Sequence, residues 1–340
     1  MPVADKAIVV GVGRYPTFGA DCRSANDLQG PVADAVAVAD WLVGTAKAEV
    51  TQILSTGGPG EPWQVTDRRP NVSDVEAAFD PFLATQQNVA TRLYVYMAGH
   101  GLAPDPRSRC LILADALGAK RVPNIEAPAW IDWFANQYQF DELVLWMDCC
   151  ATQALDYARG RPALPQTIAR ADGTPPAKVF MAFGSAVGRN SYEGPIGPGG
   201  EIRGLFTERL LRGLRGQAAN QAGEVRTASL VSFLYNGSSA TSAEVRSNTT
   251  PQPMIPQADD MLFARVALHA YVIAARADDG STLPDGMQVG LLDGTLNALA
   301  TATVAGGKVI FPLAVGLYKL QAAGLSRYLE IGAGTPSDIP

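Results

Sequence analysis

The sequence predicts an α/β fold, in which a mostly parallel sheet is flanked by helices, followed by a small C-terminal all-β domain of the sandwich type. Short apolar runs alternate with helical patterns as far as residue 235, the order expected of a parallel sheet covered on both faces. Beyond residue 262, short strands separated by turns replace the helical periodicity. The chain has 340 residues, of which 47% are hydrophobic and 18% charged, and this suffices for two such domains.

The first part of the chain supplies the strands and helices of the α/β domain. Apolar runs of strand length lie at residues 6–11, 49–55, 91–98, 110–113, 143–147 and 178–183. Apolar residues at helical spacing lie at residues 27–43, 71–89, 129–139, 204–214 and 228–235. In the second of these helices, Ser73 and Glu76 have the spacing of an N-terminal capping box. The segments 56–70 and 160–176 are rich in Pro and Gly and are expected to be loops.

The last part of the chain predicts the β-sandwich. Strands are expected at residues 263–275, 287–292, 308–313 and 317–320, with turns such as Asp278-Asp279-Gly280 between them. We therefore expect a first domain of residues 1–258, a second of residues 264–332, and a disordered tail of residues 333–340.

The composition argues against several classes of function. No run approaches the roughly 18 apolar residues that a membrane span needs. The N-terminus lacks the basic and then apolar pattern of a signal peptide. The net charge of −6 is unlike that of a nucleic-acid-binding protein, and four cysteines are too few for a disulfide framework. These features predict a cytoplasmic protein that binds neither membrane nor nucleic acid.

Two of the predicted strands each end in one reactive residue. His100 follows the apolar run 93–99, and Cys150 follows the run 143–149. Sites in open α/β sheets form at the carboxyl ends of strands, where a thiol and an imidazole make a nucleophile–base pair. Because glycine lets the backbone approach a substrate oxygen, the amides of Gly101 and Cys150 are expected to form an oxyanion hole. The pattern predicts a cysteine hydrolase with His100 and Cys150 as its catalytic residues.

Two other sites are disfavoured by the sequence. Gly11-Val12-Gly13 has the start of a dinucleotide-binding fingerprint, but Pro16 stands where the third glycine is required. His100, Cys149 and Cys150 are poorly spaced for zinc, because structural zinc sites use Cys-x-x-Cys. We therefore expect Cys149 to pack in the core, and we predict no metal or cofactor.

Five motifs in chain order carry a family resemblance. They are Leu28-Gln29-Gly30-Pro31-Val32-Ala33-Asp34-Ala35, Gly99-His100-Gly101, Cys110-Leu111-Ile112-Leu113-Ala114-Asp115-Ala116, Asp148-Cys149-Cys150, and Gly204-Leu205-Phe206-Thr207 with Leu210-Leu211. Over roughly residues 5–257 the chain resembles the caspase–metacaspase family in its bacterial, metacaspase-like branch, and the spacing of the reactive pair fits caspases. The resemblance implies a caspase-like fold and a cysteine endopeptidase with Cys150 as nucleophile. After the nucleophile the chain departs from metacaspases, with Ala151-Thr152-Gln153 in place of His-Ser-Gly.

The resemblance also implies which residues select the substrate. In metacaspases two acidic residues line the S1 pocket, and at the matching positions this chain has Asp34 and Asp148. Such a pocket favours Arg or Lys at P1 through charge-assisted hydrogen bonds. Caspases instead use arginines there and cleave after Asp. The segment Arg189-Asn190-Ser191 resembles that basic region, so Asp at P1 stays open, as does an acidic contribution from Glu193.

Calcium dependence and self-cleavage are two further possibilities that the resemblance raises. Many metacaspases bind Ca²⁺ through aspartates, and Asp115, Asp156 and Glu126 lie near positions of that kind, but the expected acidic pair is not clear. The loop 160–176 corresponds to the segment that caspases cut on maturation. We identify three arginines as candidate cleavage sites: Arg159, Arg161 and Arg170.

The expected partner is a protein or peptide substrate. A regulatory partner protein could bind the C-terminal β domain. Analogy with the family suggests a bacterial stress, cell-death or antiviral pathway. The alternative function is a catalytically weak or inactive interaction module that has kept the fold.

Overall fold

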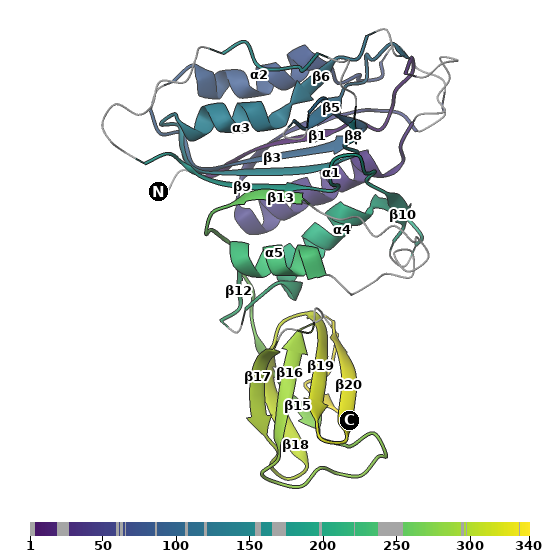
Figure 1. Cartoon of the computed structure of the whole chain (residues 1–340), viewed down its shortest axis with the longest axis vertical. Coiled ribbons are helices and arrows are strands. Elements are labelled where there is room, and N and C mark those ends of the chain that lie inside the picture. The colour runs from purple at the N-terminus through teal and green to yellow at the C-terminus, as the bar shows by residue number, and fades with distance from the viewer. Residues whose placement is uncertain are drawn as a thin grey trace. The chain divides into compact units, whose positions relative to one another are not determined.

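The computed structural model shows a mixed α/β protein with a mostly parallel central sheet, which confirms the predicted fold class (Figure 1). The structure describes residues 4–18, 27–58, 61, 64, 66–85, 87–105, 108–118, 121–153, 158–164, 175–196, 199–220, 222–236, 254–293, 296, 298–332 and 334–340. Within these ranges, no helix combines the length and apolarity that crossing a bilayer requires. The chain divides into two units, Met1–Glu208 with Ala243–Asp259 and Arg209–Ser242 with Asp260–Pro340.

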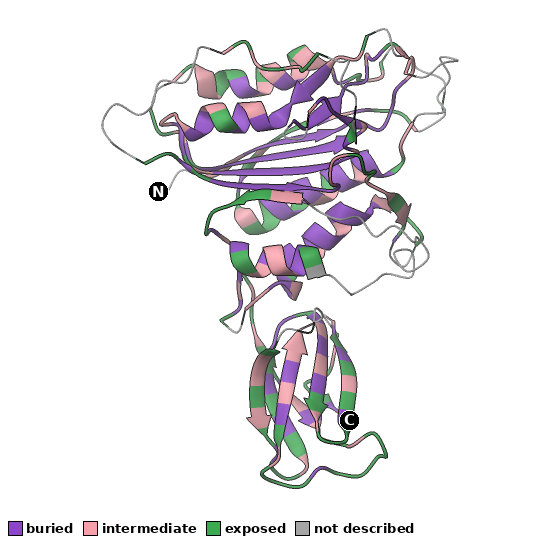
Figure 2. Ribbon diagram, viewed as in Figure 1, coloured by how far each residue is buried: buried purple, intermediate pink, exposed green. Residues whose placement is uncertain are grey.

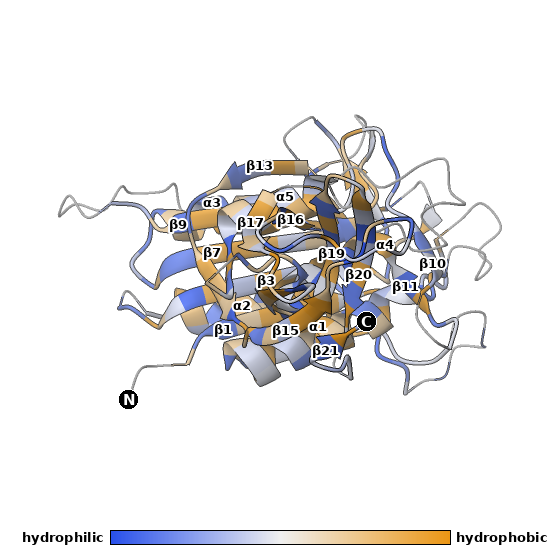
Figure 3. Ribbon diagram, turned by 90° about the horizontal axis from the view of Figure 1, so that it is seen from below, coloured by the Kyte–Doolittle hydropathy of each residue, from blue (hydrophilic) through white to orange (hydrophobic). Residues whose placement is uncertain are grey.

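Five parallel strands and one antiparallel edge strand form the central sheet of the first unit. Their order is β13-β9-β7-β3-β1-β2. The strands are β1 (Lys6–Gly11), β2 (Glu49–Leu54), β3 (Ala90–Gly99), β7 (Phe140–Cys149), β9 (Lys178–Phe183) and β13 (Met254–Ala258). The central pair, β3 and β7, is buried over nearly its whole length (Figure 2) and is strongly hydrophobic (Figure 3). Such continuous apolar runs are typical of parallel strands that are covered on both faces.

Helices cover both faces of this sheet. On one face, α2 (Val72–Leu83) and α3 (Ala127–Ala135) contribute to the same apolar cluster as the inward residues of β3 and β7. There the rings of Phe79 and Trp130 stack at 4.2 Å. On the other face, α1 (Gly30–Trp41) places Trp41 against an aromatic pair of β3 and β7.

The first two helices of the chain, α1 and α2, begin differently from each other. α2 begins with a capping box in which the Asn71 side chain accepts from the Asp74 amide and the Asp74 side chain accepts from the Asn71 amide. The cap predicted at Ser73 is therefore wrong by two positions. α1 has no side-chain cap from its own sequence, and its first amides are instead satisfied by the carboxylate of Glu193.

A second, four-stranded sheet continues the chain beyond both reactive residues. Its order is β6-β5-β4-β8. The strands are β4 (Gly101–Ala103), β5 (Cys110–Ile112), β6 (Asn124–Glu126) and β8 (Thr152–Gln153). β4 and β8 pair in parallel, with Leu102 opposite Thr152. β3 and β7 pair with each other in the central sheet, and the strands that follow them, β4 and β8, pair with each other again in the second sheet.

The second unit begins earlier in the chain than the sequence predicts. It contains β12 (Glu224–Arg226) and α5 (Thr227–Asn236). β12 pairs antiparallel with β14 (Leu262–Arg265), and this long-range pairing ties residues before 236 to those after 260. The predicted first domain of residues 1–258 therefore differs from the first unit. α4 (Leu205–Arg212) crosses the division between the units.

Two sheets form a β-sandwich in the remainder of the second unit. Their orders are β18-β15-β21 and β17-β16-β19-β20. The strands are β15 (His269–Ala274), β16 (Gln288–Asp293), β17 (Ala298–Thr303), β18 (Lys308–Leu313), β19 (Gly316–Ala322), β20 (Leu325–Ile331) and β21 (Asp338–Ile339). Both sheets contribute to one apolar core, which includes Ile273 and Leu291. The predicted disordered tail is wrong at its end, because β21 pairs with β15 and buries Ile339.

The docking of this C-terminal strand predicts a measurable contribution to stability. Ile339 is buried in the sandwich core, whereas Ile310 is 59% exposed on β18. Ile339→Ala is expected to lower the free energy of unfolding by roughly 2–4 kcal/mol through lost burial and a cavity. Ile310→Ala, the matched control, is expected to change it by less than about 0.5 kcal/mol. Equal effects in denaturant unfolding would contradict the docking of the tail.

Candidate active site

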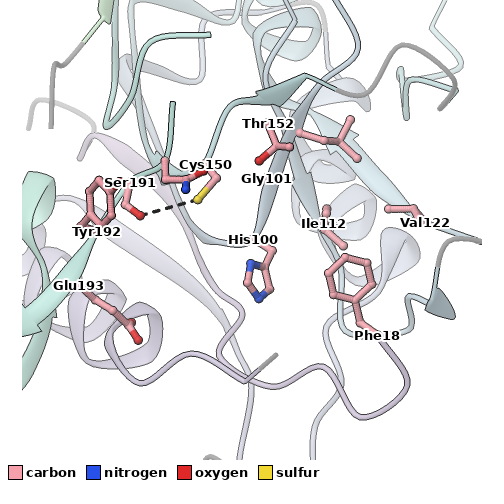
Figure 4. A pocket seen from close by; sticks show the side chains of 12 residues that line it. Phe18, His100, Gly101, Ile112, Val122, Cys150, Thr152, Ser191, Tyr192 and Glu193 are labelled. Carbon is pink, nitrogen blue, oxygen red and sulfur yellow. Dashed lines mark hydrogen bonds between the residues drawn. The ribbon is translucent and has the colours of Figure 1, made fainter. Parts of the chain in front are cut away.

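His100 and Cys150 follow neighbouring parallel strands in matched positions. β3 and β7 pair so that Gly99 lies opposite Cys149, and the next residue of each strand is the reactive one. Both side chains line one cavity of about 550 Å³. Figure 4 shows the imidazole and the sulfur facing the same space. The structure thus brings together the two residues that the sequence predicted as a nucleophile–base pair.

The backbone of His100 is fixed by Tyr15 and Ile112. The His100 amide donates to the Tyr15 hydroxyl at 2.8 Å, and that hydroxyl donates to the Ile112 carbonyl at 3.2 Å. The Ile112 amide in turn donates to the His100 carbonyl at 2.8 Å. The imidazole lies beside two rings, with centroids 4.7 Å from Tyr15 and 5.6 Å from Phe18. The ring is therefore held by aromatic packing and its backbone by hydrogen bonds.

Only glycine fits at the two positions that flank His100, because atoms of other residues lie too close for a Cβ atom there. Gly99 has a φ of +151°, and a Cβ there would lie 2.5 Å from the Tyr15 hydroxyl oxygen. A Cβ on Gly101 would lie 2.3 Å from the carbonyl oxygen of Cys150. Any side chain at Gly101 would thus push the two reactive segments apart. Gly101 also lines the cavity, as a residue that supplies an oxyanion amide must.

The thiol of Cys150 is half-buried and faces the cavity. Its sulfur donates to the Ser191 carbonyl at 3.7 Å. Burial raises the pKa of the Cys150 thiol, and the carboxylates of Asp148 and Glu193 also act in that direction. The thiol is therefore protonated at neutral pH and needs a base to become a nucleophile.

The other described cysteines are packed in the core. Cys149 is 3% exposed and belongs to the apolar cluster beneath the sheet. Burial raises the pKa of Cys149 far above its ordinary value and raises the pKa of Cys110 to about 12. Both are neutral thiols of the interior, and Cys149 has the packing role expected for it. Cys22 lies outside the described residues.

Asp148 and Asp34 lie next to each other at the N-terminal end of α4. Together with His100 and Cys150 they line a smaller cavity of about 70 Å³. A Cβ on Gly204 would lie 2.2 Å from an Asp148 oxygen and 2.8 Å from an Asp34 oxygen, so only glycine fits between the two carboxyl groups. The two residues that the resemblance assigned to S1 are therefore adjacent in the structure.

Each oxygen of these two buried carboxyl groups accepts at least one hydrogen bond from the protein. Asp148 accepts from the hydroxyls of Ser191 at 2.5 Å and Thr207 at 2.6 Å, and from the Thr207 amide at 3.1 Å. Asp34 accepts from Nε of Arg203 at 2.6 Å and from the Gly204 amide at 2.7 Å. Both carboxyl groups thus bind amides at the N-terminus of α4, which favours negative charge.

Burial keeps the acidic cavity from carrying its full charge at neutral pH. Desolvation and the neighbouring Asp148 raise the pKa of Asp34 to about 8, against the opposing effect of Arg203. Desolvation also raises the pKa of Asp148, although hydrogen bonds from Ser191 and Thr207 lower it in part. The negative charge of this cavity therefore increases as the pH rises through 8.

Several residues of the site were not predicted from sequence. Three of them, Arg203, Tyr15 and Tyr192, belong to segments without a distinctive local pattern, and contacts with residues distant in the sequence bring them to the site. Glu193, left open by the sequence, lines both cavities and accepts from the amides that begin α1. Arg189 of the basic segment is exposed and is not among the residues that line these cavities.

The residues considered for calcium are held in ion pairs instead. Glu126 is 2.6 Å from Arg161 and accepts from the Ser108 hydroxyl at 2.8 Å, while Asp115 is 3.6 Å from Arg121. Asp156 lies outside the described residues. Among the residues that the structure describes, no cluster of three His, Cys, Asp or Glu side chains is arranged to hold a metal.

Comparisons with known proteins give a distant structural likeness. No family model and no curated protein sequence matches the chain. Among solved structures, the chain is similar to the crystal structure of caspase-1 from Spodoptera frugiperda, with a TM-score of 0.47 and 14% sequence identity. The alignment covers 78% of this chain and 92% of that chain. At this level of similarity, function has to be argued from the residues of the chain itself.

The burial of the three described thiols predicts their order of reactivity. Iodoacetamide is expected to alkylate Cys150 at least about tenfold faster than Cys149 or Cys110, because only the thiolate of an accessible cysteine reacts. Since the pKa of Cys150 is raised, its rate should increase between pH 7 and pH 9. Peptide mapping by mass spectrometry measures each site. Comparable labelling of Cys149 in the folded protein would contradict this arrangement.

Proposed function

We propose that the chain is a cysteine endopeptidase that uses His100 and Cys150. The observation that carries this proposal is their shared position after β3 and β7, with both side chains in one cavity. The ordered motifs of the caspase–metacaspase type add to it. A thiol beside an imidazole at a cavity wall is the arrangement that nucleophilic acyl transfer requires.

In this proposal the reaction proceeds in two acyl-transfer steps. His100 takes the proton of Cys150, and the thiolate attacks the scissile carbonyl carbon. The amides of Gly101 and Cys150 bind the oxyanion of the tetrahedral intermediate. As the C–N bond breaks, His100 gives the proton to the leaving amine. Water then attacks the thioester with His100 as base, which releases the new carboxylate and the free thiol.

The acidic cavity favours a basic side chain at P1. A guanidinium or ammonium group can bind the carboxyl groups of Asp34 and Asp148 and approach Glu193 at the rim. An Asp side chain at P1 would instead face the three acidic groups, whose negative charge is offset in part by Arg203. Cleavage after Arg or Lys is therefore preferred over the caspase-like alternative of cleavage after Asp.

The candidate self-cleavage sites differ in how they are held. Arg159 pairs with Asp105 at 2.7 Å and Arg161 with Glu126 at 2.6 Å, so cleavage after either would first have to break these contacts. Arg170 lies outside the described residues. Self-cleavage and a bacterial stress, cell-death or antiviral role stay predictions from the resemblance. A cytoplasmic location and a regulatory partner of the β domain stay predictions from the sequence.

The adjacent cysteines provide a matched test of the nucleophile. Cys150→Ala is expected to abolish cleavage of Arg- and Lys-terminated peptidyl coumarins, whereas Cys149→Ala should retain most of it. His100→Ala should lower kcat by about 10²–10⁴-fold. An inactive wild-type chain would favour the alternative function, an interaction module that has kept the fold. Full activity in Cys150→Ala would discard the mechanism.

The raised pKa of Asp34 predicts a pH-dependent preference for charge at P1. Below its pKa of about 8 the carboxyl is neutral, and above it the carboxylate attracts a cation. The ratio of kcat/KM for Arg to that for neutral citrulline should rise about fivefold between pH 6.5 and pH 9. The ratio cancels the titration of the catalytic pair, which both substrates share. Asp34→Asn should flatten the rise, and an unchanged slope in that variant would contradict the role of Asp34.

A further inference from the structure

The cavity of about 550 Å³ extends well beyond the smaller, acidic cavity that Asp34 and Asp148 line. Both cavities include His100 and Cys150, but the larger one has a volume of about 550 Å³ against about 70 Å³ for the smaller. Its additional lining is mainly apolar: Phe18, Leu102, Ile112, Val122 and Thr152 form the apolar wall, and Gly101 and Asn190 complete the lining. A binding site for a basic side chain alone does not account for this wall.

The apolar wall lies on the histidine side of the reactive pair. In Figure 4, Tyr192 and Glu193 lie on one side of His100 and Cys150, and Phe18, Ile112 and Val122 lie on the other. In the proposed reaction His100 gives its proton to the leaving amine. The half of the substrate that begins with this amine must therefore extend past the imidazole, toward the apolar wall.

The apolar wall is built on paired backbone and is formed before substrate binds. Leu102 and Ile112 belong to the antiparallel pair β4 and β5. The segment that carries Phe18 is held by the Thr17 hydroxyl, which donates to the Ala116 carbonyl at 2.6 Å. Val122 is held through its carbonyl, which accepts from the Asn124 side chain at 2.9 Å. A preformed apolar cavity gains affinity because little ordering is required on binding.

We propose that this wall is a subsite for a bulky apolar side chain, carried by one of the first two residues after the scissile bond. The enzyme then recognises a basic residue followed closely by Leu, Ile, Met or Phe. This inference rests on the proposed endopeptidase function and names its substrate class more closely. The occupant is a segment of the substrate, because the wall is continuous with the reactive pair in one cavity.

Internally quenched peptides test the proposal on the full-length chain. All share one sequence ending in Arg before the cleaved bond, and the first and second residues after it are varied one at a time among Leu, Phe, Gly, Ser and Glu. At one of these positions, Leu or Phe is expected to raise kcat/KM at least about tenfold over Gly, Ser and Glu. The site of cleavage is verified by mass spectrometry.

Two matched variants locate the preference on the structure. Val122→Asp places a charge in the apolar wall and is expected to reduce the advantage of Leu over Gly to less than about threefold. Val43→Asp, at a position that is 55% exposed, should leave the advantage at the wild-type value. Should Val122→Asp fail to fold, Val122→Ser serves in its place. The peptide preference of the wild-type chain decides whether an apolar subsite exists, whichever variant folds.

The possible outcomes separate this inference from the function on which it rests. Cleavage after Arg that depends on Cys150 but is indifferent to both following residues overturns the apolar subsite and leaves the endopeptidase in place. An unchanged preference in a folded Val122 variant overturns the assignment to this wall. Absence of any Cys150-dependent cleavage overturns both.

Discussion

The candidate active site depends on strand pairing that fixes the chain on both sides of His100 and of Cys150. β3 and β7 pair up to Gly99 and Cys149, and β4 and β8 pair again from Leu102 and Thr152 onward. His100 and Cys150 therefore occupy the short stretches between two hydrogen-bonded registers. A slip of one residue in either pairing would turn one of them to the opposite face. Gly101 permits this arrangement, since any Cβ there would collide with the backbone of Cys150.

The acidic groups of the site have a structural role as well as the proposed role in binding. Burying a carboxyl group is costly unless its oxygens are hydrogen-bonded. The protein meets this requirement by placing Asp34 and Asp148 at the N-terminus of α4, and Glu193 at the N-terminus of α1. The same contacts hold the groups in position for a cation. Arg203 neutralises part of the negative charge of Asp34. A substrate guanidinium therefore interacts with the negative charge that remains in the cavity.

How much could be predicted from sequence depended on the range of the interactions involved. The long apolar runs of β3 and β7 predicted a buried parallel pair, and with it the positions of His100 and Cys150 at one sheet edge. β4 has three residues and β8 has two, which is too short for a recognisable alternation of apolar and polar residues. Their pairing depends on partners that are distant in the sequence. The ion pair of Asp34 with Arg203 joins residues 169 positions apart and leaves no local trace. The placement of β12 with β14 and the docking of Ile339 depend on the same kind of distant contact.

The proposed mechanism requires that Cys150 is a nucleophile, activated by His100, next to an acidic S1 cavity. A peptidyl acyloxymethyl ketone with Arg at P1 tests it directly, because the ketone alkylates only a bound and activated thiol. Intact-mass and peptide-mapping measurements should show one adduct per chain, on Cys150, formed far more slowly by His100→Ala and by the matching Asp ketone. Labelling of Cys149 or an unchanged rate in His100→Ala would contradict the assigned catalytic pair, and faster labelling by the Asp ketone would contradict the acidic S1 cavity.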